Sequence, residues 1–199
     1  MSRKILVMAH MGRQEAKDAA RASCLQLHDA GLVPVISRPD LEALQEDGLP
    51  LVPVEVIEED VSLREVELVM VLGGDGSILR AAELVRSVDT PLLGVNLGHV
   101  GFLAESERSD LAESVEAIVD GRYTVEQRMT IDVTVWQDQK KVLHTWALNE
   151  ASVEKGDREK MIEVVVEVDR RPLSTFGCDG VVLATPTGST AYAFSAGGP

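Results

Sequence analysis

Short apolar runs alternate with stretches of helical periodicity over roughly the first 120 residues. Each run is continuous and too short to be a helix, as expected for strands that are buried on both faces of a sheet. The four runs lie at residues 4–8, 33–36, 68–72 and 92–95. Because strands joined by helices usually pair in parallel through right-handed crossovers, the pattern predicts an α/β domain with a parallel sheet.

The segments beside these runs have the spacing of amphipathic helices. Helices are predicted at residues 14–30, 39–47, 78–88 and 110–120. The inner face of the first is expected to carry Ala16, Ala19, Ala20 and Leu27. Gly31 follows as its C-terminal stop. Ser62 and Glu65 have the spacing of a capping box, but no helical pattern comes after them, so no long helix is expected there.

Near residue 122 the period of the pattern changes. Apolar and polar residues now alternate, and two such runs centre on Val133 and Val166. Polar turns are predicted at residues 137–140 and 169–172. This alternation is typical of antiparallel strands with one buried face. We therefore expect two domains, an α/β domain over residues 1–122 and a mainly antiparallel β domain over residues 123–199.

Composition narrows the class of protein. The chain has 199 residues, of which 45% are hydrophobic and 26% charged, the balance of a soluble globular protein. Its formal net charge of −14 argues against a nucleic-acid-binding surface, because no basic field is available to displace counterions. An anionic ligand would have to be held by local backbone amides or by a metal ion.

The sequence carries no signal for a membrane or for secretion. The apolar run after the basic start covers only residues 5–9, and no other run could span a bilayer, so a cytoplasmic location is expected. Cys24 and Cys178 are expected to be buried, reduced thiols. The spacing of cysteines and histidines predicts no metal site, and His10 and the other three histidines are expected to be ordinary side chains.

The sharpest local feature is Gly-Gly-Asp-Gly-Ser at residues 73–77, between a predicted strand and a predicted helix. Glycines allow a ligand to approach the backbone, and the N-terminus of the helix directs N–H groups at an anion. The segment is neither a Walker A loop nor a Gly-x-Gly-x-x-Gly fingerprint. A tight turn capped by Asp75 explains the glycines equally well. Asp75 favours a catalytic site over a purely structural turn. Its carboxylate is suited to act as the base for a hydroxyl nucleophile or as a contact to a bridging cation.

Three further segments are candidates. The glycine cluster at residues 94–102 follows the next strand, where turn geometry is the commoner explanation, and Phe102 is as suited to a core as to stacking on a base. Asn149 and Glu150 end an apolar strand with a polar pair suited to hydroxyl and amide groups. The hydroxyl-rich run at residues 185–192 favours a binding loop over a solvated loop with a helix cap, and Tyr192 is placed to stack on a base.

Together and in this order, these segments resemble the ATP-NAD kinase family, whose members make NADP from NAD. The matching stretches are residues 73–77, 96–103, 148–150, 179–180, 185–192 and 195–199. The Gly-Gly-Asp-Gly core is shared with relatives of diacylglycerol, sphingosine and phosphofructokinases. The Thr-Pro-Thr-Gly-Ser-Thr-Ala-Tyr run at residues 185–192 is far more specific. The resemblance implies a Rossmann-like α/β domain, similar to that of diacylglycerol kinases, followed by a β-sandwich-like domain.

The resemblance also implies roles for residues of the first domain. Asp75 would be the base that takes the proton from the adenosine-ribose 2′-hydroxyl of NAD. That hydroxyl would attack the γ-phosphate of ATP, or polyphosphate, with Mg²⁺ or Mn²⁺ offsetting charge. Gly74 and Gly76 would shape the phosphate site, Arg80 would reach a phosphate, and Phe102 would pack on a base.

In the second domain, the resemblance implies that Asn149 and Glu150 hold NAD through hydrogen bonds to hydroxyl and amide groups, with Asp179 nearby in the binding site. The dinucleotide pocket would be lined by Thr187, Thr190, Ala191, Tyr192 and Ser195. Family members usually form homodimers or homotetramers, so the same is expected here.

The sequence departs from the family pattern in two places. Ser77 stands where the family usually has threonine, and the hydroxyl is kept. The chain also ends at residue 199, where the family continues, so a truncated second domain is expected. Two alternatives remain open at this point, a lipid or sugar kinase that shares the glycine loop and a non-catalytic dinucleotide-binding module.

Overall fold

The computed structural model describes residues 2–97, 106–107, 111–157 and 159–198. The chain divides into two compact units, Met1–Glu126 and Gln127–Pro199. Within the described residues, no helix is long and apolar enough to cross a membrane.

The first unit is built on a six-stranded sheet in the order β3-β2-β1-β4-β5-β6. Every pairing in this sheet is parallel, as the sequence predicts. The strands are β1 (Lys4–Ala9), β2 (Val33–Ile36), β3 (Glu55–Val56), β4 (Leu68–Leu72), β5 (Leu92–Asn96) and β6 (Ser106–Glu107). The sequence pattern did not predict the two-residue edge strands β3 and β6, because two residues are too few for any periodicity to show.

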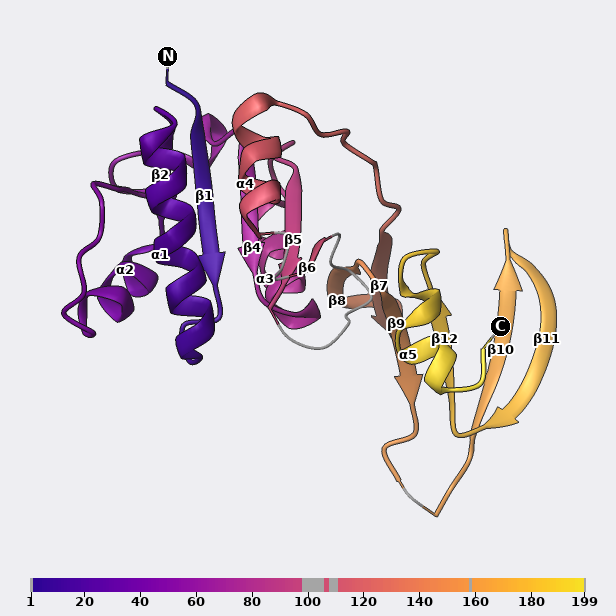
Figure 1. The fold of residues 1–199 in the computed structure, drawn as a ribbon. Helices are drawn as coiled ribbons and strands as arrows, with labels where there is room; N and C mark the ends of the chain where they lie inside the picture. Colours follow the sequence, from indigo (N-terminus) through magenta and orange to yellow (C-terminus); the bar gives the residue numbers. More distant parts are fainter. Residues whose placement is uncertain (1, 98–105, 108–110, 158, 199) are drawn as a thin grey trace. The chain divides into compact units, whose positions relative to one another are not determined.

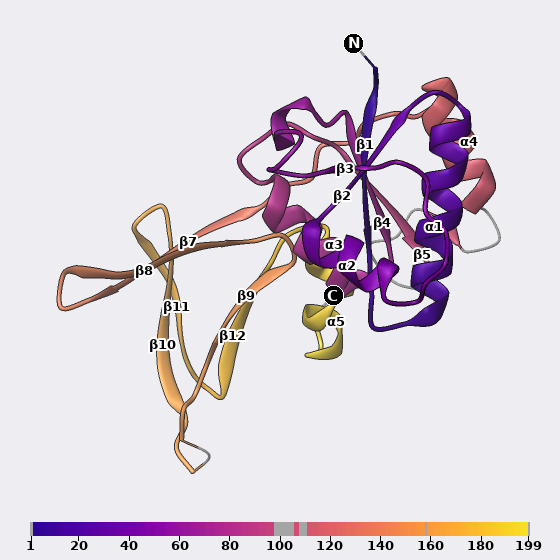
Figure 2. The ribbon, with the colours of Figure 1, turned by 90° about the vertical axis from the view of Figure 1, so that its left-hand side faces the viewer.

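The helices of the first unit cover both faces of this sheet. They are α1 (Gln14–Asp29), α2 (Arg38–Gln45), α3 (Asp75–Val85) and α4 (Leu111–Asp120), with a short 3₁₀ helix, η1 (Leu63–Glu65). Figure 2 shows α1 and α4 side by side on one face. The capping box at Ser62 and Glu65 is present, but it begins only the three residues of η1.

Helix α3 corrects the expected boundaries, because it begins three residues earlier than the predicted range of 78–88. Gly74 is the N-cap, with an extended conformation of φ −97° and ψ −170°, and Asp75 is already helical. Glycine is a poor residue for a helix interior, so the pattern suggested a longer loop. In the first turn Gly76 is tolerated, because the side chains that follow it, Ile78 and Ala81 among them, pack into the core.

Alternation along β1 divides the core of this unit in two. Ile5 and Val7 pack with α1, α2 and α4, whereas Leu6 and Met8 pack with α3. The residues predicted for the inner face of α1, Ala16, Ala19, Ala20 and Leu27, are all buried. Cys24 is fully buried as well, and burial raises the pKa of its thiol to about 12.

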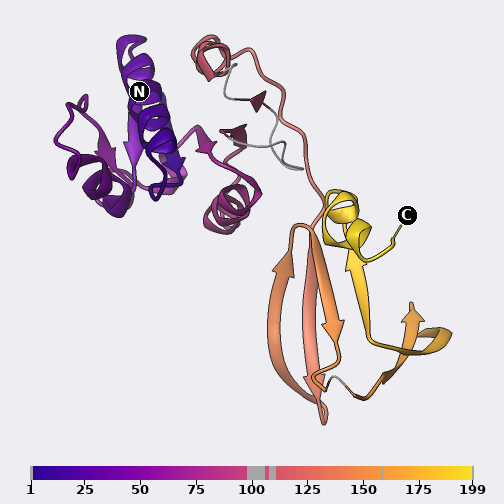
Figure 3. The same cartoon turned by 60° about the horizontal axis from the view of Figure 1, so that its bottom comes forward.

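The second unit consists of three antiparallel strand pairs (orange to yellow in Figure 3). They are β7 (Ile131–Gln137) with β8 (Lys140–Ala147), β9 (Glu150–Glu154) with β12 (Gly180–Ala184), and β10 (Ile162–Val168) with β11 (Arg171–Cys178). The 3₁₀ helix η3 (Gly188–Thr190) and helix α5 (Tyr192–Ser195) follow (Figure 1). The antiparallel character is confirmed, and a sandwich of two packed sheets stays a prediction.

The predicted turn at residues 137–140 is present, and the second turn lies one residue earlier than predicted, at 168–171 instead of 169–172. The central residues of each have positive φ, 49° at Asp138 and 63° at Gln139 in the first, and 51° at Asp169 and 65° at Arg170 in the second. Two consecutive residues with positive φ are the signature of the type I′ turn, whose twist matches that of the strands it joins.

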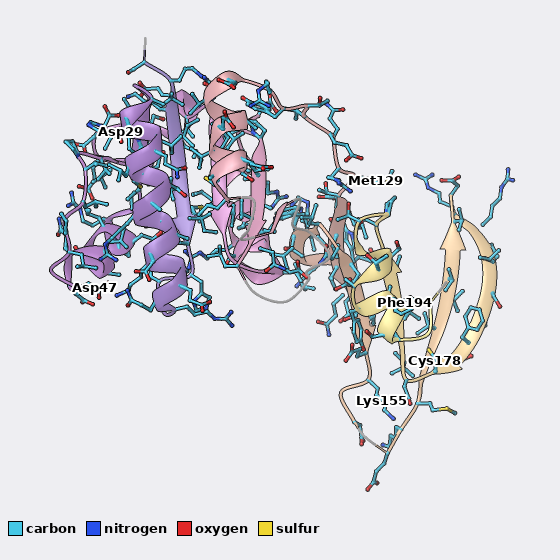
Figure 4. The ribbon with its side chains drawn as sticks, viewed as in Figure 1. Asp29, Asp47, Met129, Lys155, Cys178 and Phe194 are labelled. Atoms are coloured by element: carbon cyan, nitrogen blue, oxygen red, sulfur yellow. The ribbon has the colours of Figure 1, made fainter. Side chains whose placement is uncertain are left out.

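The described part of the second unit buries none of its hydrophobic side chains. Met129 and Phe194, labelled in Figure 4, are 65% and 63% exposed, and Leu173 is 71% exposed. Cys178 is only half-buried, so the expectation of two buried thiols is wrong for this one. Strand pairs with exposed apolar faces need a further layer to cover them.

Candidate functional sites

A cavity of about 340 Å³ lies in the first unit at the carboxyl edge of its sheet. Its lining comes from the segments that follow β1, β4 and β5, namely His10, Arg13, Glu15, Ala16, Gly73, Gly74, Gly76, Ser77, Asn96 and Leu97. The strand order reverses between β1 and β4, since β2 and β3 extend the sheet on one side and β5 and β6 on the other. Such a topological switch point is where open α/β sheets bind their ligands.

The glycines after β4 shape one wall of this cavity. A Cβ on Gly73 would lie 2.5 Å from Ser77 Oγ, so only glycine allows this hydroxyl to fold back over the turn between β4 and α3. Ser77 N–H in turn donates to the Gly74 carbonyl oxygen at 2.9 Å. Gly74 and Gly76 line the cavity, as the phosphate-site prediction requires.

Asp75 is the first residue of α3, between these two glycines, and its side chain is half-buried. At this position the positive end of the helix macrodipole favours a carboxylate. The carboxylate therefore stands beside the cavity without being part of its lining.

Arg80 has a different neighbour from the one expected. It lies in the second turn of α3, it is exposed, and it is not among the residues that line the cavity. Its charge acts on Asp40 of α2, which is 5% exposed. Burial raises the pKa of Asp40, while a hydrogen bond with Ser37 and the positive charge of Arg80 act in the opposite direction. A phosphate contact for Arg80 stays a prediction.

Sequence reasoning missed the wall contributed by the turn between β1 and α1. His10, Arg13 and Glu15 line the cavity, although His10 was expected to be an ordinary histidine. The available signal was positional, since these residues follow the first predicted strand just as residues 73–77 follow a later one. Carboxyl ends of parallel strands meet at one edge, so every segment that follows such a strand is a candidate.

The glycine cluster at residues 94–102 is described only in part. Asn96, which is 5% exposed, and Leu97 line the cavity. Phe102 lies outside the described residues, so its predicted contact with a base stays a prediction.

In the second unit, the hydroxyl-rich run is fastened to the backbone of Leu148 and Asn149, just before β9. Thr185 N–H donates to the Asn149 carbonyl oxygen at 2.8 Å, and Thr185 Oγ1 donates to the Leu148 carbonyl oxygen at 2.6 Å. Gly188 N–H donates to Thr185 Oγ1 at 3.0 Å. A Cβ on Gly188 would overlap the carbonyl oxygen of Asn149, so this close approach requires glycine. The run therefore begins as a fixed loop that packs on Asn149.

Two polar atoms beside this loop are buried and lack a hydrogen-bond partner among the described residues. They are Asn149 Oδ1 and Glu150 Oε2. Buried acceptors of this kind are costly unless a ligand or water satisfies them. The predicted dinucleotide contacts thus include acceptors suited to the hydroxyl and amino groups of a nucleotide.

The remaining predicted residues are spread along the β9–β12 pair. Glu150 pairs with Ala184, whereas Glu154 pairs with Gly180, next to Asp179. Four residues of strand separate these two pairs by roughly 14 Å. Asp179 forms an ion pair with Lys155 at 2.7 Å, so the structure does not bring it together with Glu150.

Tyr192 and its neighbours are the last of the residues predicted to bind the dinucleotide. Tyr192 Oη donates to Glu154 Oε1 at 3.3 Å, on the Asp179 side of the pair. Thr187 and Ala191 are half-buried, whereas Thr190 and Ser195 are exposed. Any ligand that touches all of these residues has to be extended, as a dinucleotide is.

The described residues contain no group of three or more histidine, cysteine, aspartate or glutamate side chains that could hold a metal ion. Mg²⁺ commonly takes one or two carboxylates and fills its coordination with water and substrate phosphates. Asp75 beside the glycine cavity fits that second arrangement.

The first unit is thus a Rossmann-like α/β domain with a glycine-lined cavity at its switch point, and an antiparallel β unit with a fixed hydroxyl loop follows it. The sequence model of the ATP-NAD kinase N-terminal domain matches residues 5–123, and that of the ATP-NAD kinase C-terminal domain matches residues 148–199. The chain belongs to the ATP-NAD kinase family.

Two similar proteins match this chain over almost its whole length. It is 56% identical over 197 residues to the NAD kinase of Leifsonia xyli, covering 99% of this chain and 65% of that protein. It is 52% identical over 203 residues to the NAD kinase of Thermobifida fusca, covering 100% of this chain and 62% of that protein. The chain therefore spans slightly less than two thirds of the length of these relatives.

Two solved structures are similar in fold. A yeast NADH kinase complexed with NADH superposes with a TM-score of 0.85 at 23% identity, covering 100% of this chain and 62% of that one. An NAD kinase from Archaeoglobus fulgidus in complex with ATP superposes with a TM-score of 0.63 at 25% identity, covering 100% of this chain and 66% of that one.

Proposed function

We propose that this protein is an NAD kinase, which transfers the γ-phosphate of ATP, or a phosphate of polyphosphate, to the adenosine-ribose 2′-hydroxyl of NAD. The position of Asp75 carries the proposal, because it places a carboxylate at the start of α3 between two glycines that line the cavity. Membership of the ATP-NAD kinase family supports it, as do the named activities of relatives about half identical to this chain.

Asp75 acts as the general base. Its carboxylate takes the proton of the ribose 2′-hydroxyl, a bond forms from that oxygen to the γ-phosphorus, and the bond between the γ-phosphorus and the bridging oxygen of ATP breaks to release ADP. Gly74 and Gly76 present backbone to the phosphates, and the N-terminus of α3 favours their negative charge. Arg80 is the further phosphate contact proposed on α3.

A divalent cation, Mg²⁺ or Mn²⁺, is part of the proposal. Asp75 and the substrate phosphates would hold it, and it would supply neutralisation of phosphate charge. A chain of net charge −14 has particular need of such a counter-charge near a triphosphate.

The second unit holds NAD in this proposal. The unpartnered acceptors of Asn149 and Glu150 take hydrogen bonds from ribose hydroxyls or the nicotinamide or adenine amino groups. Asp179, Thr187, Thr190, Ala191, Tyr192 and Ser195 provide contacts along the extended dinucleotide. Phe102 is proposed to pack on a base. The protein is proposed to work in the cytoplasm as a homodimer or homotetramer, and the exposed apolar side chains of the second unit support association.

The test is formation of NADP by the full-length protein with NAD and ATP, with other nucleoside triphosphates and with polyphosphate. We expect Asp75→Asn to lower kcat roughly 100-fold or more, the usual scale for a positioned base, with NAD affinity preserved. NAD binding without phosphate transfer from any of these donors would instead indicate a non-catalytic binding module. Phosphorylation of a lipid or sugar without affinity for NAD would indicate another kinase that shares the glycine loop.

A further inference from the structure

The wall of the cavity formed by the turn between β1 and α1 has no role in the proposal so far. This wall lies beside the glycines that follow β4 and contributes His10, Arg13, Glu15 and Ala16. Among the described residues that line the cavity, Arg13 is the only lysine or arginine.

The backbone of this turn is fixed against the glycine loop. His10 N–H donates to the carbonyl oxygen of Leu72, the last residue of β4, at 3.2 Å. Arg13 N–H donates to the His10 carbonyl oxygen at 3.0 Å and so closes the turn. A Cβ on Gly73 would lie 3.9 Å from His10 Cβ, which places the two segments in contact. Arg13 is therefore held beside the glycine loop by main-chain hydrogen bonds.

The charge of Arg13 is not neutralised within the described residues. Its side chain is exposed and forms no ion pair or hydrogen bond there. Most other cations of the first unit do form ion pairs, namely Arg3, Lys4, Lys17, Arg21, Arg38 and Arg122. In a chain of net charge −14, an unpaired arginine that lines a cavity gives that cavity a local positive charge. Glu15 brings a carboxylate to the same cavity, so Arg13 is what lets this wall accept an anion.

The two helices that begin at the cavity differ from α2 and η1 in how their N-termini are capped. Neither α1, whose N-cap is Arg13, nor α3, whose N-cap is Gly74, has a side-chain cap. By contrast, Ser37 caps α2 and Ser62 caps η1 through their hydroxyl groups. Two helix N-termini without side-chain caps, one from each wall, thus face a cavity that also holds an unpaired guanidinium. Each of these features favours a bound anion with several charged oxygens.

We infer that Arg13 binds the phosphate chain of the nucleoside triphosphate from the β1–α1 turn, in the cavity that Gly74 and Gly76 also line. The inference rests on the proposed function and adds a phosphate-binding residue of the donor site. A guanidinium can donate two parallel hydrogen bonds to phosphate oxygens, which one ammonium group cannot reproduce. The β1–α1 turn and the glycine loop then hold the triphosphate from two sides.

The experiment compares Arg13→Gln and Arg13→Lys with the wild type in the full-length protein. Arg64→Gln is the matched control, because Arg64 is also exposed and unpaired among the described residues but lies on η1, before the amino end of β4. KM is measured for ATP at saturating NAD and for NAD at saturating ATP. We expect Arg13→Gln to raise KM for ATP roughly 10- to 100-fold, the usual effect of losing a charge-assisted pair. We expect Arg13→Lys to lie between Arg13→Gln and the wild type, and KM for NAD to stay within about twofold.

Binding of inorganic tripolyphosphate, followed by calorimetry, separates this inference from the proposed function. The probe carries no base, ribose or acceptor, so it reports on phosphate contacts even if the wild type makes no NADP. Weaker tripolyphosphate binding in Arg13→Gln, with thermal unfolding unchanged, supports the inference. Wild-type affinity for tripolyphosphate in Arg13→Gln, or a rise in KM for NAD alone, overturns it.

Discussion

At the scale of the residue, glycines decide how closely the candidate segments approach one another. Gly73 lies under the Ser77 hydroxyl, and Gly188 lies against the Asn149 carbonyl oxygen. Neither residue has a positive φ, so conformational freedom is not the reason for glycine at these positions. The reason is space, because a single methyl group would force backbone or side chain to move.

Gly188→Ala should therefore displace the hydroxyl loop from Asn149. The added methyl group meets backbone that cannot rotate away, so we expect a destabilisation of about 1–3 kcal/mol and NAD affinity at least tenfold lower. Calorimetric titration with NAD and thermal unfolding measure the two effects. Gly156→Ala is the control, because a Cβ there would meet nothing within 4 Å. Equal NAD affinity in the two variants would contradict this account of the loop.

The site residues differ in how far sequence could predict them. Gly74 and Gly76 line the cavity. Their role could be predicted because glycines after a buried strand are a local signal in the sequence. The cavity-lining position of Arg13 had only a positional signal, because it depends on the pairing of β1 with β4. The separation of Asp179 from Glu150 likewise follows from the register of β9 with β12, which sequence pattern does not specify.

At the scale of the element, one ionic cluster joins three parts of the first unit. Arg3, just before β1, donates to both carboxylate oxygens of Glu67 at 2.7 Å and to the carbonyl oxygens of Ile118 and Val119 in α4. Tyr123 Oη donates to Glu67 Oε1 at 2.8 Å. The cluster fixes the last turn of α4 to the edge of the sheet opposite the cavity. The hydrogen bond from Arg3 is the largest influence on Glu67 and lowers its pKa below 4.5.

We expect Arg3→Gln to lower the free energy of unfolding of the first unit by about 1–2 kcal/mol at pH 7, allowing for the partial exposure of the pair. Because folding lowers the pKa of Glu67, its ionised carboxylate stabilises the folded state at pH values above its unfolded-state pKa. This stabilisation is lost as the pH falls through the folded-state pKa. The difference from the wild type should therefore shrink below about pH 4.5.

Urea unfolding at pH 7 and at pH 3.5 measures this effect. Arg122→Gln is the control, because Arg122 forms only exposed ion pairs with Asp120 and Glu116 and should change stability by less than about 0.5 kcal/mol. The same destabilisation by Arg3→Gln at both pH values would show that packing, and not the charge of Glu67, explains the loss.

The element scale is also where sequence patterns predicted most. The predicted strands at 33–36 and 68–72 coincide with β2 and β4, because a strand buried on both faces leaves a continuous apolar run. The start of α3 was misplaced, since Gly76 in its first turn weakened the helical signal. Strand β3 has too few residues to leave a pattern and exists because β2 is there to pair with it.

At the scale of the whole molecule, the two units differ in how much of their surface they bury. The first unit has hydrophobic clusters on both faces of its sheet, whereas the described part of the second has none. A unit with a packed core can fold on its own, but paired strands with exposed apolar faces have little to offset the loss of chain entropy.

Residues 1–126 expressed alone should therefore unfold cooperatively on heating, and residues 127–199 expressed alone should not. Circular dichroism during heating and binding of a hydrophobic dye measure the difference, with the intact 199-residue chain as the reference. We expect strong dye binding only for residues 127–199. A sharp thermal transition in that segment alone would show that its strand pairs form a core by themselves.

The net charge of −14 now has a structural counterpart. Most cations of the first unit are taken up by neighbouring carboxylates, while the cavity combines glycines, helix N-termini and Arg13. An acidic protein can thus offer an anion site without a basic surface, because the site depends on a few groups placed at short range.

The succession of the longer strands and helices along the chain, their parallel or antiparallel character and the glycine and hydroxyl segments follow from the amino-acid sequence, because periodicity and turn chemistry are local properties of a chain. The position of Arg13 in one cavity with Gly73 and Gly74, the packing of Gly188 on Asn149 and the distance between Glu150 and Asp179 were decided by tertiary structure. These depend on strand order and register, which arise from long-range pairing and leave no periodic trace in the sequence.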